Sequence, residues 1–145
     1  LRQEGIYFVL LEKSGKRPFQ QEWQNKLIEY DSQELLEHLE NKGNYGVLGG
    51  GLKNLIIIDF DNEKIQEEVC KKLPQTFTVK TGSGKIHKYF FSDRSESFKI
   101  LDEDLNTLAD VQGIGKQVVG ANSIHPNGKK YEIIDDSDIV FIAYS

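Results

Sequence analysis

Residues 55–61 constrain the fold most, because this run is strongly apolar and ends in two carboxylates. Branched apolar residues in series suit a buried strand that is covered on both faces. Side chains alternate along a strand, so Asp59 and Asp61 project from the same face. Two neighbouring acids repel each other, and a divalent cation relieves that repulsion. In the structural alternative, one Asp is a surface residue and Asp61 caps a helix that begins at Asn62.

The composition is that of an ordinary soluble domain. The chain has 145 residues, 38% hydrophobic and 28% charged, which is enough for one domain with one core. No apolar run approaches the ~20 residues that cross a bilayer, so no membrane contact is expected. Cys70 is the single cysteine, which excludes a disulfide framework or a thiolate zinc site and favours a cytoplasmic location. Because the chain begins with Leu1, we expect residues 1–145 to be a single domain and a fragment of a longer protein.

The net charge of −5 argues against a protein that simply coats nucleic acid. The two signs are segregated along the chain, however, so a local basic surface remains possible. Lys16 and Arg17, or Lys129 and Lys130, are candidates for contacts with nucleic-acid phosphates, and solvated surface lysines are the alternative.

Hydrophobic periodicity predicts two helices among several short strands. The first helix follows a capping-box pattern at residues 31–34 and ends near Asn41, and the second covers residues 62–73. Residues 92–104 are polar and unpatterned, which predicts a surface loop. The order favours an α+β fold, with a mostly antiparallel sheet backed by helices. Strands are expected at 6–11, 45–48, 55–61, 76–80, 86–91, 107–111, 117–119 and 131–134.

Further polar groups follow the aspartate pair. Ser83 lies in a glycine-rich turn at residues 81–84, Lys85 follows that turn, and His87 stands near the start of the returning strand. A histidine beside such a turn can donate a hydrogen bond to a phosphate oxygen, although a lone strand histidine is more often packed or exposed. Asp110 adds a third carboxylate on a short apolar strand.

A polar loop at residues 118–128 leaves two interpretations open. Asn122, Ser123 and His125 either line a binding pocket or satisfy their own turn. The aromatic residues Trp23 and Tyr89 are expected in the core rather than as platforms for base stacking.

Taken in order, these motifs resemble a known family. An aspartate pair ends an Ile-rich strand, and a Ser-x-x-x-His hairpin, an apolar-Asp strand and a Ser-x-His-Pro-x-Gly-x-x-Tyr segment follow. This order is similar to the primase-polymerase (prim-pol) catalytic domain of the archaeo-eukaryotic primase superfamily, in the form found in archaeal plasmids, phages and other mobile elements. Residues 16–18 followed by Trp23, and residues 43–49, are also typical of the family, and the resemblance spans residues 6–134.

The resemblance implies a core like an RNA-recognition motif with an additional α/β element. It implies template-dependent nucleotidyl transfer, as a DNA primase or DNA polymerase with two Mg²⁺ or Mn²⁺ ions. Asp59, Asp61 and Asp110 would be the catalytic, metal-binding carboxylates, and His87 would contact the nucleotide phosphates. Lys85 stands where the family usually has a small residue.

The chemistry of these residues agrees with those roles. Three carboxylates can hold two metal ions about 3.5–4 Å apart, which activate a 3′-hydroxyl and stabilise pyrophosphate. His87, Lys85 and Lys116 would neutralise the triphosphate, with Ser83 and Ser123 as further nucleotide-binding residues. The expected partners are a DNA template or primer, dNTPs or NTPs, and a helicase domain or other replication proteins.

Two other functions remain open at this stage. Asp-x-Asp also occurs in metal-dependent nucleases and in sugar-nucleotide transferases, neither of which obviously requires the hairpin of residues 83–87. The fold could also serve as a catalytically silent nucleic-acid-binding domain of a replication initiator, which the negative net charge disfavours.

Overall fold

The strand β3 (Leu55–Phe60) lies at the centre of a seven-stranded sheet in the computed structural model, which describes residues 5–143. The sheet has the order β6-β7-β3-β5-β4-β9, and β10 pairs with β5. All pairs are antiparallel except β10 with β5. The other strands of this sheet are β4 (Thr78–Lys80), β5 (Ile86–Phe91), β6 (Phe98–Leu101), β7 (Thr107–Gln112), β9 (Glu132–Asp135) and β10 (Val140–Phe141).

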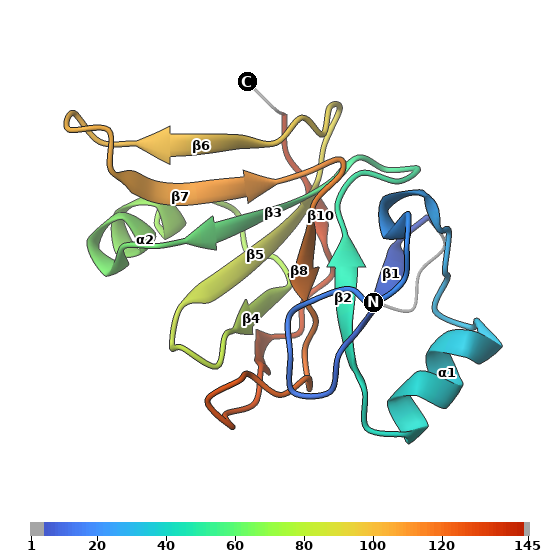
Figure 1. Cartoon of the computed structure of the whole chain (residues 1–145). Coiled ribbons are helices and arrows are strands. Elements are labelled where there is room, and N and C mark those ends of the chain that lie inside the picture. Colours follow the sequence, from blue (N-terminus) through green and yellow to red (C-terminus); the bar gives the residue numbers. More distant parts are fainter. Residues whose placement is uncertain (1–4, 144–145) are drawn as a thin grey trace.

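A second, three-stranded antiparallel sheet lies beside the first (Figure 1). It has the order β1-β2-β8 and contacts the helix α1. The described chain therefore has a mostly antiparallel architecture with two α-helices, in agreement with the predicted α+β class. The remaining elements are β1 (Tyr7–Leu11), η1 (Trp23–Asn25), α1 (Gln33–Glu40), β2 (Asn44–Leu48), α2 (Glu63–Cys70) and β8 (Gln117–Val119).

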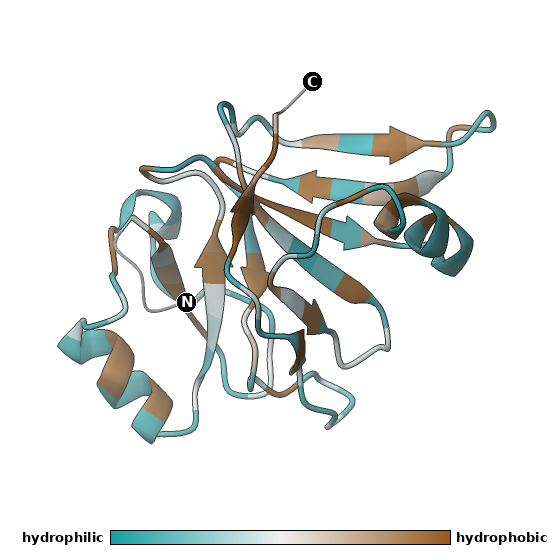
Figure 2. Cartoon of the chain, turned by 180° about the vertical axis from the view of Figure 1, so that it is seen from behind, coloured by the Kyte–Doolittle hydropathy of each residue, from teal (hydrophilic) through white to brown (hydrophobic). Residues whose placement is uncertain are grey.

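The strand β3 is buried on both faces, as its apolar sequence predicts. Ile56, Ile58 and Phe60 point to one face and belong to a cluster against which α2 packs through Ile65 and Val69. The hydropathy colouring shows the apolar residues of β3 and its neighbours as brown bands across the sheet (Figure 2).

The opposite face of β3 belongs to a larger cluster. Leu55 and Ile57 join the buried residues of the small sheet there. Because side chains alternate, this is also the face to which Asp59 points. The carboxylates therefore lie where the apolar contact between the two sheets gives way to polar residues.

Two strands lie outside the predictions. The expected surface loop at 92–104 is wrong in part, because residues 98–101 form β6 at the edge of the large sheet. Most of this strand is solvent-exposed, so it carries little apolar periodicity. The two-residue β10 is similarly too short to give a signal.

The helix starts differ from the predictions in their caps. Asn62, not Asp61, caps α2, because its Oδ1 accepts hydrogen bonds from the backbone of Lys64 and Ile65. Ser32 occupies the cap position of α1, but its side chain makes no capping hydrogen bond. Asp61 is therefore not used as a helix cap. Within residues 5–143, neither helix is long and apolar enough to cross a membrane.

Candidate active site

Three polar residues form one row across the large sheet. Asp59 on β3 is the cross-strand partner of Asp110 on β7 and of His87 on β5. Paired residues in neighbouring strands project to the same face, so the three side chains share one surface. Their closeness depends entirely on strand pairing, since they are far apart along the chain.

Each carboxylate of this surface has a cationic or imidazole neighbour. Asp59 Oδ1 lies 3.3 Å from His87 Nε2, and Asp61 Oδ1 lies 3.5 Å from Lys85 Nζ. Asp110 Oδ1 lies 3.5 Å from the Nζ of Lys99 on β6. The lysine pairs are partly exposed to solvent, so each contributes little to stability and can be exchanged for a ligand.

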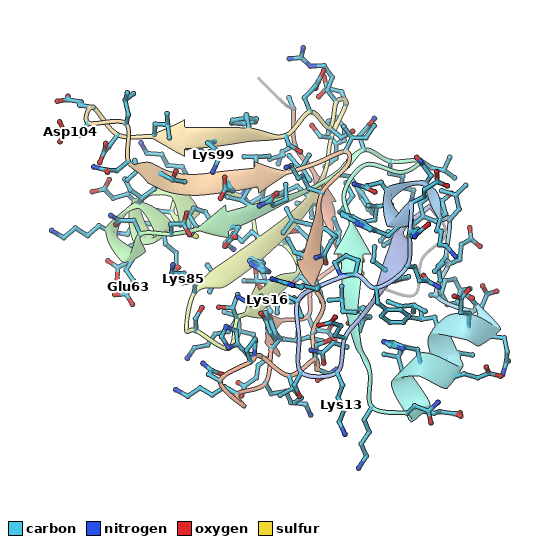
Figure 3. All side chains as sticks on the ribbon, viewed as in Figure 1. Lys13, Lys16, Glu63, Lys85, Lys99 and Asp104 are labelled. Atoms are coloured by element: carbon cyan, nitrogen blue, oxygen red, sulfur yellow. The ribbon has the colours of Figure 1, made fainter. Side chains whose placement is uncertain are left out.

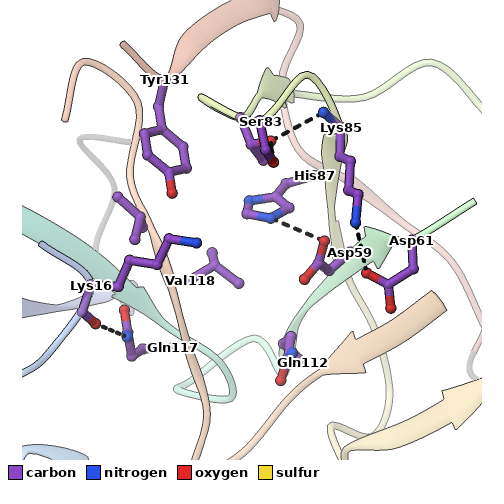
Figure 4. A pocket seen from close by; sticks show the side chains of 12 residues that line it. Lys16, Asp59, Asp61, Ser83, Lys85, His87, Gln112, Gln117, Val118 and Tyr131 are labelled. Atoms are coloured by element: carbon purple, nitrogen blue, oxygen red, sulfur yellow. Dashed lines mark hydrogen bonds and ion pairs between the residues drawn. The ribbon is translucent and has the colours of Figure 1, made fainter. Parts of the chain in front are cut away.

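A cavity of about 250 Å³ opens over Asp59 and Asp61 (Figure 4). Its acidic side is formed by these two carboxylates at the end of β3. Its other side carries cations and hydrogen-bond donors from several separate segments, so the cavity can receive both a cation and a polyanion. The lining residues are Lys16, Asp59, Asp61, Thr81, Ser83, Lys85, His87, Gln112, Gln117, Val118, Val119 and Tyr131.

Lys16 brings a positive charge from the small sheet to the cavity. Its side chain reaches into the space opposite Asp59, and Lys13 on the same loop points away (Figures 3 and 4). Its loop is fixed from two sides, since Gln117 donates to the Lys16 carbonyl at 3.2 Å and Asn44 donates to the Gly15 carbonyl at 3.0 Å.

Asn44 also fixes a second loop of the site. Its Nδ2 donates to the Ile124 carbonyl at 2.7 Å, and its Oδ1 accepts from the Ile124 backbone N–H at 2.9 Å. Only 2% of Asn44 is exposed, so these partners cannot be replaced by water without a rearrangement. One buried amide therefore positions both the Lys16 loop and the loop that leads to Tyr131.

The glycine-rich turn after β4 packs closely against the loop 125–128. A Cβ on Gly82 would lie 2.2 Å from the Cβ of His125, so this position requires glycine. Asn127 Nδ2 donates to the Gly82 carbonyl at 3.0 Å. The turn is thereby held in one place, with Ser83 at the edge of the cavity.

His87 is 94% buried, but one of its ring nitrogens has no partner. Its residual exposure is 6%, and Nδ1 makes no hydrogen bond within the part of the chain that the structure describes. A buried polar atom of this kind is unfavourable unless a partner is supplied. The ring lies between Asp59 and Tyr131, beside the cavity (Figure 4).

Tyr131 lines the cavity directly before β9, and its side chain is buried. Burial, with a smaller contribution from the negative charge of Asp59, raises the pKa of the Tyr131 phenol to about 12. The hydroxyl is therefore protonated at neutral pH and can act as a hydrogen-bond donor in the cavity.

The carboxylates have the donor chemistry that Mg²⁺ or Mn²⁺ requires. Asp59, Asp61 and Asp110 offer hard oxygens on one face, and all three are partly exposed. In their present conformations, however, no three Asp, Glu, His or Cys side chains within residues 5–143 form a group that could hold a metal ion. Binding an ion there requires the carboxylates to turn away from their lysine and histidine neighbours.

The structure brings most of the predicted site residues to this cavity. Those that line it are Asp59, Asp61, Ser83, Lys85 and His87.

Three predicted residues do not line the cavity. Asp110 lies beside Asp59 in the sheet but is directed to Lys99. Lys116 is exposed outside the cavity, and its carbonyl accepts from the Gly49 N–H. Ser123 is buried, and its hydroxyl accepts a hydrogen bond from the backbone of Tyr45 at 3.2 Å.

Lys16 and Tyr131 are among the cavity residues that were not predicted in this position. The sequence suggested Lys16 for nucleic-acid phosphates, and Tyr131 was interpreted only as part of a strand. The signal for Tyr131 was its place at the end of the Ser-x-His-Pro-x-Gly-x-x-Tyr segment. Of the expected core aromatics, Tyr89 is fully buried and Trp23 packs partly buried against the larger cluster.

Nearly the whole sequence matches a known protein family. Residues 1–143 match the family described as bifunctional DNA primase/polymerase, N-terminal (Prim-Pol). The match covers nearly the whole sequence, so the chain belongs to the Prim-Pol family, as the motifs suggested. No curated protein matches the sequence significantly.

Proposed function

We propose that this chain is a metal-dependent nucleotidyltransferase that joins nucleotides on a DNA template, as a primase, a polymerase or both. One observation carries the proposal: two carboxylates and several cationic or hydrogen-bonding side chains line the same 250 Å³ cavity. Membership of the Prim-Pol family supports the same activity. We also propose that residues 1–145 form a single catalytic domain.

Asp59 and Asp61 are the proposed principal metal ligands, with Asp110 as the third. Two Mg²⁺ or Mn²⁺ ions, when bound, would lower the pKa of the attacking hydroxyl and neutralise charge on the leaving group. The three carboxylates would hold them from one face of the sheet. For this role Asp110 has to exchange Lys99 for the ion, and Asp61 has to exchange Lys85.

The opposite side of the cavity is proposed to bind the triphosphate. Lys85, once released from Asp61, can pair with a phosphate oxygen, and the buried Nδ1 of His87 can find there the partner that it lacks. Ser83 adds a hydroxyl from the turn, and Lys16 adds a cation from the small sheet. Tyr131 can donate a hydrogen bond to the sugar or to a phosphate.

The reaction forms one bond and breaks one. A 3′-hydroxyl oxygen attacks the α-phosphorus of the nucleotide, its proton passes to solvent, and pyrophosphate leaves with the bridging oxygen. The residues of this chain bind and orient the reactants, and such positioning supplies much of the barrier reduction in phosphoryl transfer.

We also propose that the fold contains an RNA-recognition-motif-like core with an additional α/β element. The strand β3 with α2 on one face and carboxylates on the other corresponds to the catalytic half of an RNA-recognition-motif-like core. The sheet β1-β2-β8 with α1 corresponds to the additional α/β element.

The direct test is primer extension and unprimed synthesis on single-stranded DNA, with Mg²⁺ or Mn²⁺ and either dNTPs or NTPs. The intact protein is expected to extend a primer, and Asp59→Asn is expected to lose at least about 100-fold in rate. Equal activity of the two proteins would refute the proposal. Degradation of DNA with metal but without nucleotide would indicate a nuclease instead.

A further inference from the structure

A basic groove lies on the other side of the turn that borders the cavity. We propose that Lys80, Lys129 and Lys130 bind the backbone phosphates of a nucleic-acid strand in this groove. The inference rests on the proposed function in one respect, namely that the strand is the template or primer of the reaction.

The groove is a separate depression with a volume of about 310 Å³. Its walls are Lys80, the turn at 81–84, Lys129, Lys130 and Glu132. The turn after β4 and the loop after β8 lie at the same end of the molecule in both views (Figures 1 and 2).

The charge of the groove is positive although the chain carries a net charge of −5. Three lysines surround it, and Glu132 is the single acid among the residues that form it. Within residues 5–143, none of the three lysines lies within ion-pair distance of a carboxylate, and all three are exposed. Unpaired, clustered lysines of this kind attract a polyanion and release its counterions.

Hydrogen bonds hold the backbone segment that carries Lys129 and Lys130. Residues Ile124 and Lys130 pair as a β-bridge, and the His125 N–H donates to the Lys129 carbonyl at 2.8 Å. The side chain of Asn127, in the same segment, donates a hydrogen bond to the Gly82 carbonyl. The positions of the backbone that carries the cations are therefore set before a ligand arrives, which reduces the entropic cost of binding.

The groove adjoins the proposed active site. Thr81 and Ser83 line both the groove and the cavity, so only the thickness of one turn separates them. A strand whose end or templating base lies near Asp59 can thus continue over the turn into the groove. This continuity favours an extended strand over a free mononucleotide, whose phosphates are already accommodated by the cavity.

The test measures binding of a fluorescein-labelled oligothymidylate longer than about 16 nucleotides, by anisotropy, without metal or nucleotide. The variants are Lys80→Gln and the double variant Lys129→Gln/Lys130→Gln. The matched control is Lys71→Gln/Lys72→Gln, which removes two exposed lysines at the end of α2. Each lost phosphate contact is expected to reduce the slope of log Kobs against log salt by about 0.7.

We expect at least about a tenfold loss of affinity in the double groove variant, a smaller loss in Lys80→Gln, and no change in the control. Equal DNA affinity of the groove variants and the intact protein would overturn the proposal.

A second measurement separates this proposal from the proposed activity. Binding of a fluorescent nucleoside triphosphate in Mn²⁺ is expected to be unchanged in the groove variants and weakened in Asp59→Asn. If the groove variants lose nucleotide affinity but keep DNA affinity, the groove serves the triphosphate and the proposal is refuted. An inactive protein that still shows the expected DNA-binding pattern would refute the catalytic proposal alone.

Discussion

Asp59 and Asp110 lie directly opposite each other on the antiparallel strands β3 and β7. Like charges in this arrangement cost up to about 1 kcal/mol, because the side chains of cross-strand partners approach closely. Each acid has a neighbour on its outer side, His87 for Asp59 and Lys99 for Asp110. The pair lies at a partly open surface, and a divalent cation bound between the two acids would offset their repulsion.

Metal binding should therefore stabilise the protein. At a Mn²⁺ concentration tenfold above its Kd, we expect about 1.4 kcal/mol of stabilisation, which raises the Tm by about 5 °C. Asp59→Asn should abolish this shift because one ligand and much of the local negative charge are lost. Differential scanning fluorimetry with and without Mn²⁺ checks both outcomes.

The matched control is Asp136→Asn, an exposed carboxylate that does not line the cavity. It should keep the full shift. A metal-induced shift that persists in Asp59→Asn would mean that the ions bind elsewhere.

Replacing Lys85 should weaken nucleotide binding with little effect on stability. The side chain of Lys85 is 44% exposed and its pair with Asp61 is long, so the pair adds at most about 1 kcal/mol. In Lys85→Gln we expect the KM for nucleotide to rise about tenfold and the Tm to change by less than about 3 °C. Steady-state primer extension and thermal denaturation measure the two effects.

The companion variant is Lys116→Gln, which removes an exposed lysine outside the cavity. Its KM should equal that of the intact protein. The same rise in KM for both variants would point to general electrostatic attraction rather than to a contact in the cavity.

Asn44→Ala should destabilise the protein and loosen the cavity together. The substitution removes three hydrogen bonds and leaves two carbonyls and one N–H without their partner, at a cost of about 3 kcal/mol. Because Asn44 holds the Lys16 loop, nucleotide affinity should fall as well. Urea unfolding and nucleotide binding at a temperature where the variant is folded provide the measurements, with Asn41→Ala at the end of α1 as the control.

Stability should decline at alkaline pH through Tyr45 and Tyr131. Burial raises the pKa of each phenol to about 12, with the charge of Asp59 adding to the effect at Tyr131. Both pKa values lie above the ordinary value near 10, so the unfolded chain loses these protons first. The stabilisation is complete below pH 10 and disappears as the pH rises toward 12.

At pH 11, the loss should be about 1 kcal/mol per tyrosine. Denaturant titrations at pH 8 and pH 11 measure it, and Tyr131→Phe should reduce the difference between them. An unchanged difference in that variant would show that the Tyr131 phenol titrates normally.

Several elements followed from the sequence because their signals are local. The run at 55–61 predicted a buried strand, and β5 and β8 begin and end at the predicted residues. Alternation along one strand was sufficient to put Asp59 and Asp61 on one face. Local signals failed at β6, because a mostly exposed strand carries little alternation of apolar and polar residues. They also failed at the start of α2, where Asp61 and Asn62 are both suitable capping residues and Asn62 is the one that caps the helix.

The sequence by itself determined which residues we propose for the chemistry, namely the Asp pair, the hairpin with His87, and the strand with Asp110. Only the tertiary structure decided which of them meet. Strand register joins Asp59 to His87 and Asp110, and the packing of the small sheet brings Lys16 to the same cavity while Lys116 stays outside. The physical reason is that pairing and packing are non-local: they join residues through contacts that no spacing along the chain encodes.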